Sequence, residues 1–103
     1  VEFFVDRNDN LYVNEIAPRV HNSGHLTINA YNISQFENHV RAVCSLEKIT
    51  IKKISNAEMI NIIGDQIIPY RENAQLSDKQ FFFDYLKTEI KEKRKMGHLT
   101  TLK

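Results

Sequence analysis

Cysteine, glycine and proline are scarce in this chain of 103 residues, and tryptophan is absent. The single cysteine, Cys44, cannot form a disulfide within the chain or complete a cysteine zinc site, which is typical of a cytoplasmic protein. No apolar run approaches the roughly 18 residues that span a bilayer, so a transmembrane protein is excluded. The first residues also lack the basic start and cleavage site of a signal peptide. The length allows one domain or part of a larger one.

Neither sign of charge dominates, since 14 basic residues face 13 acidic ones, for a net charge of +1. This balance argues against a general nucleic-acid or membrane binder. The distribution is uneven, however. Residues 1–46 carry a net charge of −2, whereas residues 87–103 hold six basic and two acidic side chains. An acidic first part and a basic last part can meet around one ligand that carries both a metal ion and phosphates.

Two β-type runs, residues 1–5 and 11–16, flank a cluster of turn-forming residues and predict a β-hairpin. Because side chains alternate along a strand, each run places one carboxylate among apolar neighbours, Glu2 in the first and Glu15 in the second. The alternative interpretation is that both carboxylates simply face water at an edge. The chain starts inside the first run and without methionine, so we expect a fragment of a longer enzyme.

Beyond the hairpin, the pattern predicts one helix and then strands, in an α+β fold. Pro18 stops regular pairing, and Ser34-Gln35-Phe36-Glu37 has the form of a capping box that opens a helix over 35–45. The strands expected after it cover 48–54, 59–63, 80–86 and 96–102, with a long connection over 69–80 and a charged loop over 87–95. We therefore expect two units, residues 1–46 and a small antiparallel β-rich domain of barrel or sandwich type over 47–103.

The densest group of polar side chains runs from Asn14 to His25, at the exit of the second predicted strand. A carboxylate such as Glu15 suits magnesium, which takes one or two carboxylates together with substrate phosphates. The fork of Arg19 suits a planar oxyanion. A zinc site at His21 and His25 is disfavoured, because the residues between them are poor helix formers.

Three further features have simpler interpretations. His39 is expected to be a hydrogen-bonding residue on the helix, and Cys44 a core residue rather than a nucleophile. The basic stretch from Lys87 to His98 reads by itself as a solvated hairpin. Its neighbouring aromatic residues, 81–83 and Tyr85, precede the bases and are expected in the core, which disfavours a nucleic-acid surface.

Four segments taken in order resemble the C-terminal part of the N5-carboxyaminoimidazole ribonucleotide synthetases, the ATPase subunits of phosphoribosylaminoimidazole carboxylase in the ATP-grasp superfamily. They are Val-Glu-Phe-Phe-Val at 1–5, Val-Asn-Glu-Ile-Ala-Pro-Arg-Val-His-Asn-Ser-Gly-His at 13–25, Ser-Gln-Phe-Glu-Asn-His-Val-Arg-Ala-Val at 34–43 and Arg-Lys-Met-Gly-His-Leu-Thr at 94–100. The resemblance implies that residues 1–46 end an ATP-grasp domain.

The resemblance also implies a reaction: ATP and bicarbonate carboxylate the exocyclic amine of 5-aminoimidazole ribonucleotide through carboxyphosphate, in purine biosynthesis. Magnesium and ATP are the implied cofactors. The implied site residues are Glu2 and Glu15 for the metal, Asn14 and Glu15 for the nucleotide, and Arg19, His21, Asn22, Lys87, Arg94 and Lys95 for the substrates. Arg19, His21 and Lys87 are the implied catalytic residues.

The chain departs from the family pattern at Tyr85-Leu86-Lys87, where the family commonly has Tyr-Gly-Lys. Most of the family's nucleotide pocket lies outside these residues, so we expect the chain alone to be inactive. Its open hairpin edges are expected to favour a homodimer. Two alternatives stay open: a non-catalytic module whose basic end binds phosphate or nucleic acid, and a divergent ATP-grasp carboxylase with another substrate. The synthetase interpretation expects neither a membrane nor a nucleic-acid partner.

Overall fold

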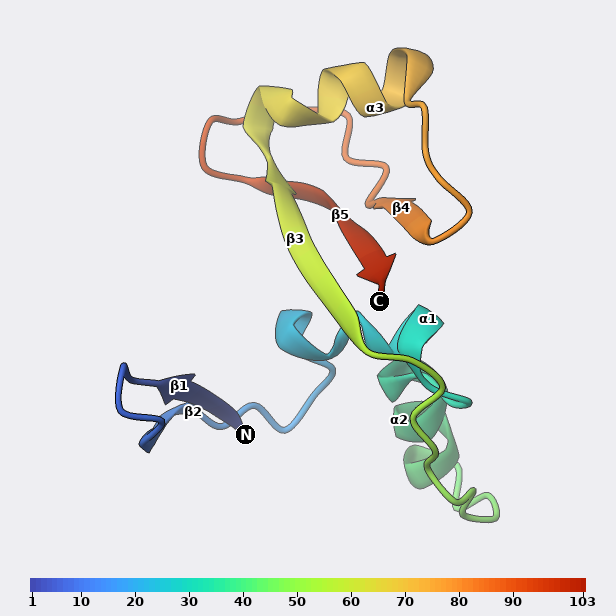
Figure 1. Ribbon diagram of the computed structural model, residues 1–103. Coiled ribbons are helices and arrows are strands. Elements are labelled where there is room, and N and C mark those ends of the chain that lie inside the picture. The colour runs from blue at the N-terminus through green and yellow to red at the C-terminus, as the bar shows by residue number, and fades with distance from the viewer.

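The structure is a computed structural model that describes residues 1–103, and it confirms the predicted α+β fold (Figure 1). Its elements are described in two parts. The first part contains β1 (Glu2–Val5), β2 (Leu11–Glu15), a 3-10 turn η1 (Asn22–Gly24), α1 (Thr27–Ala30) and α2 (Gln35–Val43). The second contains β3 (Ala57–Ile63), a 3-10 turn η2 (Gly64–Gln66), α3 (Ile67–Asn73), β4 (Gln80–Asp84) and β5 (Lys95–Leu102). The helices are too short and too polar for any of them to traverse a lipid bilayer.

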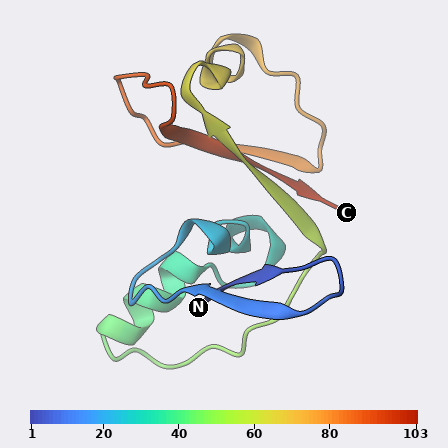
Figure 2. The same cartoon turned by 90° about the vertical axis from the view of Figure 1, so that its left-hand side faces the viewer.

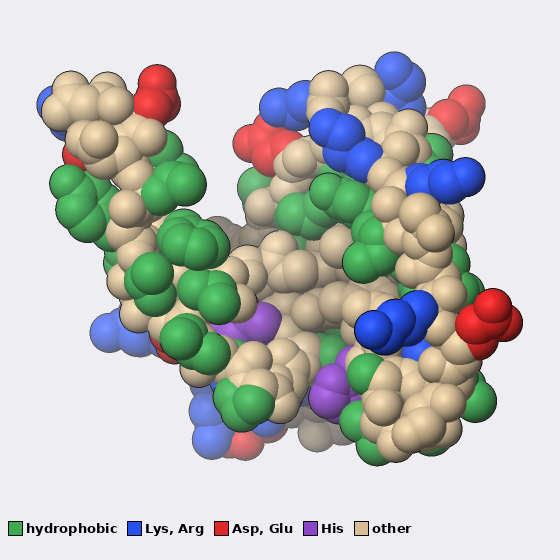
Figure 3. All heavy atoms as spheres, turned by 90° about the horizontal axis from the view of Figure 1, so that it is seen from below, with side chains coloured by type: hydrophobic (Ala, Val, Ile, Leu, Met, Phe, Trp, Pro, Cys, Tyr) green, Lys and Arg blue, Asp and Glu red, His purple; other side chains and the backbone are tan.

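The predicted hairpin is confirmed, and Asp6 explains its turn. The Asp6 carboxylate accepts hydrogen bonds from the backbone N–H groups of Asn8 (2.8 Å) and Asn10 (2.9 Å), as turn-forming aspartates do. The antiparallel register pairs Glu2 with Glu15 and Val5 with Leu11. In Figure 3 the hairpin is an arm that stands away from the rest of the molecule and carries exposed hydrophobic side chains.

The predicted helix is confirmed as α2, and the Ser34 side chain caps it by accepting from the backbone N–H of Glu37 (3.1 Å). Its apolar face is largely uncovered, because Val40 and Val43 are 55% and 70% exposed. The same lack of cover explains why the core assignment of Cys44, the residue that ends α2, is wrong: its side chain is exposed. His39 is also exposed and makes no side-chain hydrogen bond, contrary to the prediction.

The second part is a three-stranded antiparallel sheet in the order β3-β5-β4, with α3 packed across it (Figure 2). A core forms where the helix meets the sheet, from Ile62, Ile67, Met96 and Leu99. The predicted strands over 59–63, 80–86 and 96–102 correspond to β3, β4 and β5. The middle strand β5 is buried on both faces, because the face of His98 and Thr100 turns toward the first part of the chain.

Two predicted segments are wrong. Residues 48–54 form no strand apart from one bridge between Tyr31 and Lys53. The Asn32 side chain bonds instead to the Thr50 carbonyl (3.1 Å) and the Lys52 N–H (2.7 Å), so it holds this segment where a neighbouring strand would pair. The connection expected over 69–80 begins with helix α3. Pro69 lies in the first turn of that helix, where a missing N–H costs no hydrogen bond.

Candidate functional site

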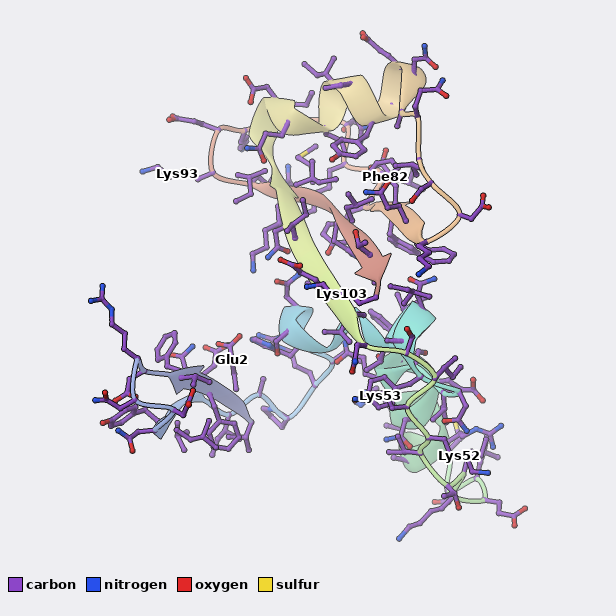
Figure 4. The ribbon with its side chains drawn as sticks, viewed as in Figure 1. Glu2, Lys52, Lys53, Phe82, Lys93 and Lys103 are labelled. Atoms are coloured by element: carbon purple, nitrogen blue, oxygen red, sulfur yellow. The ribbon has the colours of Figure 1, made fainter.

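The two carboxylates of the hairpin meet one histidine of the following loop. Glu2 and Glu15 face each other across β1 and β2, and His21 lies against both. One possible ligand atom from each of the three side chains lies within 4.8 Å of the others. In Figure 4 the labelled Glu2 projects from the side of the hairpin that is turned toward η1. The predicted pair of carboxylates is therefore brought together, and His21 joins it.

Hydrogen bonds define the tautomer of His21. Its Nδ1 accepts from the backbone N–H of Ser23 (3.3 Å) and lies 2.9 Å from the Ser23 hydroxyl. A nitrogen that accepts carries no proton in the neutral ring, so Nε2–H is the donor, and it faces the Glu15 carboxylate. Asn14 donates through its side-chain amide to Glu2. The two carboxylates thus each have a hydrogen-bonding partner: Asn14 for Glu2 and His21 for Glu15.

A cavity of about 220 Å³ opens beside this cluster. Its lining is mostly polar and includes Glu2, Glu15, Arg19, His21 and Gln35. The Arg19 side chain is exposed and makes one hydrogen bond, from Nη1 to the Val20 carbonyl (2.9 Å). Its remaining N–H groups are available to an anion in the cavity. The structure therefore places Arg19 and both carboxylates around one space, as a site for a metal ion and an anion requires.

Gln35, which the sequence analysis treated only as the start of a helix, fixes the loop that carries His21. Its side chain accepts from the His21 N–H (2.9 Å), donates to the His21 carbonyl (2.7 Å) and reaches His25 Nδ1 (2.6 Å). A Cβ at Gly24 would lie 2.7 Å from Gln35 Oε1, so a larger residue there would displace this side chain from its contacts with His21. The helix start therefore determines the shape of the loop, a role that its sequence pattern does not reveal.

The basic end of the chain reaches this loop through Lys95. The Lys95 ammonium donates to Asn22 Oδ1 (2.8 Å), although the two residues lie 73 positions apart. Lys87 is close by, since its ammonium donates to the Lys95 carbonyl (2.7 Å) and lies 5.5 Å from the centre of the Tyr85 ring. Arg94 is not brought to the group, because it bonds to the Glu89 carbonyl (3.3 Å).

Leu86 occupies the position where the family pattern has glycine, and its backbone has a φ of 54°, in the left-handed region. Glycine adopts this conformation without steric cost, whereas leucine does not. The chain therefore keeps the backbone turn that a glycine would favour. This turn supports the alignment of Lys87 with the lysine of the Tyr-Gly-Lys pattern.

A second, more apolar cavity of about 510 Å³ lies between the two parts of the chain and contains His25, Tyr85 and His98. The Tyr85 hydroxyl lies 2.9 Å from His98 Nδ1, and the His25 and His98 rings are 5.5 Å apart. Burial lowers the pKa of both His25 and His98 and raises the pKa of the Tyr85 hydroxyl. All three side chains are therefore neutral at pH 7.

Gln35, Asn61, Tyr85 and His98 also belong to this site, Asn61 because its Oδ1 accepts a hydrogen bond from Asn22 Nδ2 (2.8 Å), and none of the four was predicted from the sequence. Tyr85 was assigned to the core with its aromatic neighbours, and Asn61 lies inside a β-branched run that gives no functional signal. His98 belongs to the Met-Gly-His motif that carries the family resemblance, which was the one available indication. The zinc interpretation of His21 and His25 gains no support, because the His25 ring turns to Gln35 and Phe36.

The donor set at Glu2 and Glu15 suits magnesium better than a softer metal. Two of the three possible ligands are carboxylates, with side chains that are 30% and 51% exposed, so a hydrated ion can reach them. Magnesium is held through one or two carboxylates and keeps several waters or phosphate oxygens. The nearby histidine nitrogen is already bonded to Ser23 and is not required as a ligand.

Two family models match the chain. An ATP-grasp domain matches residues 1–36, and the phosphoribosylaminoimidazole carboxylase C-terminal domain matches residues 57–103. The N5-carboxyaminoimidazole ribonucleotide synthase of Bacillus subtilis is 43% identical over 103 residues, which is 100% of this chain and 27% of the relative. The synthase of Staphylococcus aureus strain COL is 44% identical over 104 residues, with 99% of this chain and 28% of the relative covered.

Solved structures agree with the sequence matches. The Staphylococcus aureus N5-carboxyaminoimidazole synthetase complexed with ADP has a TM-score of 0.84 and 41% identity, and the match covers 98% of this chain and 28% of that one. The Aspergillus clavatus synthase in complex with ADP and 5-aminoimidazole ribonucleotide has a TM-score of 0.84 and 34% identity, with 98% and 29% covered.

The chain thus spans little more than a quarter of the length of the relatives that it matches. The sequence match runs through both parts of the chain, including the hairpin carboxylates and the basic end. The fold agrees over nearly every residue. The chain belongs to the N5-carboxyaminoimidazole ribonucleotide synthetase family of the ATP-grasp superfamily, and it corresponds to the C-terminal part of those proteins.

Proposed function

We propose that this chain supplies metal- and anion-binding groups to an ATP-dependent carbon–nitrogen ligase. The reaction is the carboxylation of 5-aminoimidazole ribonucleotide by bicarbonate and ATP, through carboxyphosphate. The observation that carries the proposal is the meeting of Glu2, Glu15 and His21 at a cavity that Arg19 also lines. The nucleotide and ribonucleotide named with the solved relatives support the choice of substrates.

Glu2 and Glu15 hold magnesium in this proposal, and Asn14 lies beside them at the nucleotide. A magnesium ion held by these two carboxylates would supply positive charge to the ATP phosphates. The register pairs Glu2 directly with Glu15, and an irregularity between Glu2 and Phe3 lets the two carboxylates lie opposite each other at the end of the hairpin. The Asn14 amide orients the Glu2 carboxylate, and the His21 ring orients that of Glu15. Neither carboxylate therefore has to be ordered when the ion arrives.

Arg19 and His21 act on the anion. Bicarbonate and carboxyphosphate present planar or tetrahedral arrays of oxygens, which a guanidinium fork grips through paired hydrogen bonds. The Arg19 N–H groups that face the cavity provide this grip. His21 lines the same cavity and acts on the anion indirectly, because its Nε2–H faces Glu15 and orients that carboxylate. When a bicarbonate oxygen attacks the γ-phosphorus of ATP and ADP leaves, Arg19 stabilises the negative charge on the oxygens of bicarbonate and of the carboxyphosphate that forms.

Lys95, Lys87 and Arg94 bind the ribonucleotide and its phosphate, with Asn22 beside the reacting groups. The Lys95 ammonium already touches the loop of Asn22, so it can bridge the anion and the ribonucleotide. Lys87 is joined to the Lys95 backbone and approaches from the same side. Arg94 pairs with Glu89 in this structure and must leave that contact to reach a phosphate.

The exposed apolar surface of the chain is consistent with a role as part of a larger protein. Both faces of the hairpin and the apolar side of α2 carry uncovered large side chains, among them Phe4, Val13 and Val43. Apolar area of this extent is normally covered by protein. We therefore propose that the chain is inactive alone, and that further sequence or a second copy in a homodimer covers these surfaces.

A chimera tests the proposal. The 103 residues replace the matching segment of the Bacillus subtilis synthase. The match includes every residue of this chain. Phosphate release from ATP in bicarbonate buffer is then measured with and without 5-aminoimidazole ribonucleotide, with the unmodified Bacillus protein as the positive control. Release that needs the ribonucleotide and is lost in Glu15→Gln supports the proposal. Turnover that is indifferent to the ribonucleotide supports a divergent carboxylase instead.

A further inference from the structure

The side-chain amide of Asn22 lies where the η1 loop meets the C-terminal sheet, and both of its ends are engaged. Its Nδ2 donates to Asn61 Oδ1 (2.8 Å) and lies 3.4 Å from the Tyr85 hydroxyl. Its Oδ1 accepts from the Lys95 ammonium (2.8 Å). One amide therefore joins three residues of the second part of the chain to a loop of the first part.

The chemistry of Lys95 determines which way this amide points. An ammonium group can only donate, so it requires the oxygen of Asn22 and not its nitrogen. The nitrogen of Asn22 must then face Asn61, which has to present its own oxygen. The need of Lys95 for an acceptor therefore fixes the orientation of both asparagine amides. If Asn61 offered no acceptor, the Asn22 amide would lose the partner that keeps its oxygen toward Lys95.

Tyr85 and His98 form a fixed support behind the two asparagines. Because the Tyr85 oxygen faces the Asn22 donor, its own O–H is free to donate to His98 Nδ1, which lies 2.9 Å away. His98 is only 1% exposed, and its ring stacks on Phe83 with centroids 5.4 Å apart and planes at 7°. Asn61 and His98 are direct partners in the register of β3 and β5. The support therefore has little freedom to move.

We propose that Asn61, supported by Tyr85 and His98, is a positioning residue that orients the Asn22 amide and thereby aims the Lys95 ammonium at the substrates. The inference rests on the proposed function for the identity of those substrates. It adds residues that do not touch them. Asn61 acts through Asn22, and it does so only while its oxygen can accept a hydrogen bond.

Three variants in the chimera separate positioning from folding. Asn61→Leu keeps the approximate shape of the side chain but removes the hydrogen-bond acceptor. We expect kcat/KM for the ribonucleotide to fall about fivefold to tenfold, which corresponds to the loss of one hydrogen bond. KM for ATP should stay unchanged. Asn61→Asp keeps an acceptor and is expected to recover most of the loss. Glu58→Gln, on the exposed face of the same strand, is the matched control.

A double-mutant cycle with Asn22→Ala shows whether Asn61 acts through Asn22. If it does, adding Asn61→Leu to Asn22→Ala causes little further loss, because coupled residues are not additive. Losses that multiply, or an Asn61→Asp variant as impaired as Asn61→Leu, overturn the proposal. A loss that appears equally in the KM for ATP also overturns it, since that pattern indicates general damage to the fold.

A second measurement keeps the inference testable if the chimera does not use the ribonucleotide, an outcome that would refute the proposed function alone. The chimera is labelled with ¹⁵N-asparagine, and the side-chain NH₂ signals of Asn22 are assigned by their absence in Asn22→Ala. Asn61→Leu is expected to shift these signals and to speed their hydrogen exchange about tenfold, because one bonded N–H is released. Unchanged signals overturn the positioning role whatever the activity.

Discussion

Glu2 and Glu15 face each other across the hairpin, and His21 contacts both carboxylates from the loop that follows. Like charges in such proximity repel, so the arrangement is favourable when a cation lies between them. The His21 ring is itself held by the contact of its Nδ1 with the Ser23 hydroxyl (2.9 Å). The relationship places the two carboxylates that we propose as metal ligands side by side on paired strands.

Neutralising either carboxylate is expected to weaken divalent metal binding. In the chimera with ADP present, Glu2→Gln and Glu15→Gln should each raise the Kd for Mn²⁺. The increase should be at least as large as the roughly 10- to 100-fold loss of affinity that follows removal of a residue that supports a metal ligand. Titration followed by the electron paramagnetic resonance of free Mn²⁺ measures this change. Asp9→Asn, in the turn of the same hairpin, is the control and should leave the Kd unaltered. An equal effect of all three variants would point to net charge rather than to a site.

The stability of the chain is expected to fall below about pH 6.5, the ordinary pKa of histidine. Burial lowers the pKa of both His25 and His98. The nearby His21 and Lys95 lower the pKa of His25 further, and His25 lowers that of His98. Since the unfolded chain binds more protons than the folded one in this range, stability is complete above the unfolded pKa and is lost as the pH falls.

Denaturant unfolding of the chimera at several pH values between 5 and 8, roughly, measures this slope. His98→Asn keeps a polar atom near the position of Nδ1 but cannot be protonated, so it should flatten the pH dependence. His39→Asn, at an exposed position on α2, is the matched control and should leave the slope as it is. A slope that survives in His98→Asn and in His25→Asn would contradict the assignment of these two histidines.

Replacing Leu86 by glycine is expected to leave stability unchanged or to raise it by up to about 1 kcal/mol, because the left-handed backbone is strained for leucine. The exposed Leu86 side chain, 80% accessible, contributes little packing. Thermal melting of the chimera measures the change. Leu46→Gly, at a position outside the left-handed region, is expected to lower the melting temperature. Equal losses in both variants would show that the Leu86 backbone is not strained.

The Arg71–Asp84 pair is expected to matter more than an ordinary surface ion pair. Arg71 makes two hydrogen bonds to Asp84 (2.7 and 2.9 Å) and a third to the Lys87 carbonyl (3.0 Å). This hydrogen bonding lowers the pKa of Asp84. Arg71→Met should lower the melting temperature of the chimera more than loss of an ordinary surface ion pair does, and Arg71→Lys should not restore it, because lysine lacks the planar fork.

Arg41→Met provides the comparison, since Arg41 pairs with Glu37 within α2 by a single bond of 2.9 Å. Pairs of this kind contribute about 0.3–0.5 kcal/mol. Because Arg71 also holds the backbone beside Lys87, its loss should raise KM for the ribonucleotide, whereas Arg41→Met should not. A change in stability without any change in that KM would confine Arg71 to a structural role.

Local patterns were sufficient to predict the hairpin, the start of α2 and three of the later strands. Their signals lie in neighbouring residues: the Asp6 turn, the Ser34 cap and the alternation of apolar side chains. The strand predicted over 48–54 does not form, because backbone groups of this segment bond to the Asn32 side chain and not to a neighbouring strand. Helix α3 was not predicted because residues 69–80 contain several turn-forming residues, although Pro69 in the first turn is compatible with a helix.

The site was predictable to the extent that its residues belong to one motif. Glu15, Arg19 and His21 lie within a few positions of each other, and Glu2 follows from the pairing of two strands. Asn61 and Tyr85 reach the site only through packing between residues far apart in the chain, which no local pattern encodes. The family resemblance supplied Lys95 as a candidate, and its contact with Asn22 appears only in the structure.

The central claim is that the hairpin carboxylates and the basic end of the chain serve one reaction. The most direct test measures ATP turnover by the chimera in bicarbonate buffer while the ribonucleotide is titrated, in Glu15→Gln and in Lys95→Met. The account predicts that Glu15→Gln loses turnover at every ribonucleotide concentration, whereas Lys95→Met raises KM for the ribonucleotide at least tenfold, approximately, and leaves KM for ATP unchanged. A Lys95→Met variant whose KM rises for ATP and not for the ribonucleotide would contradict it.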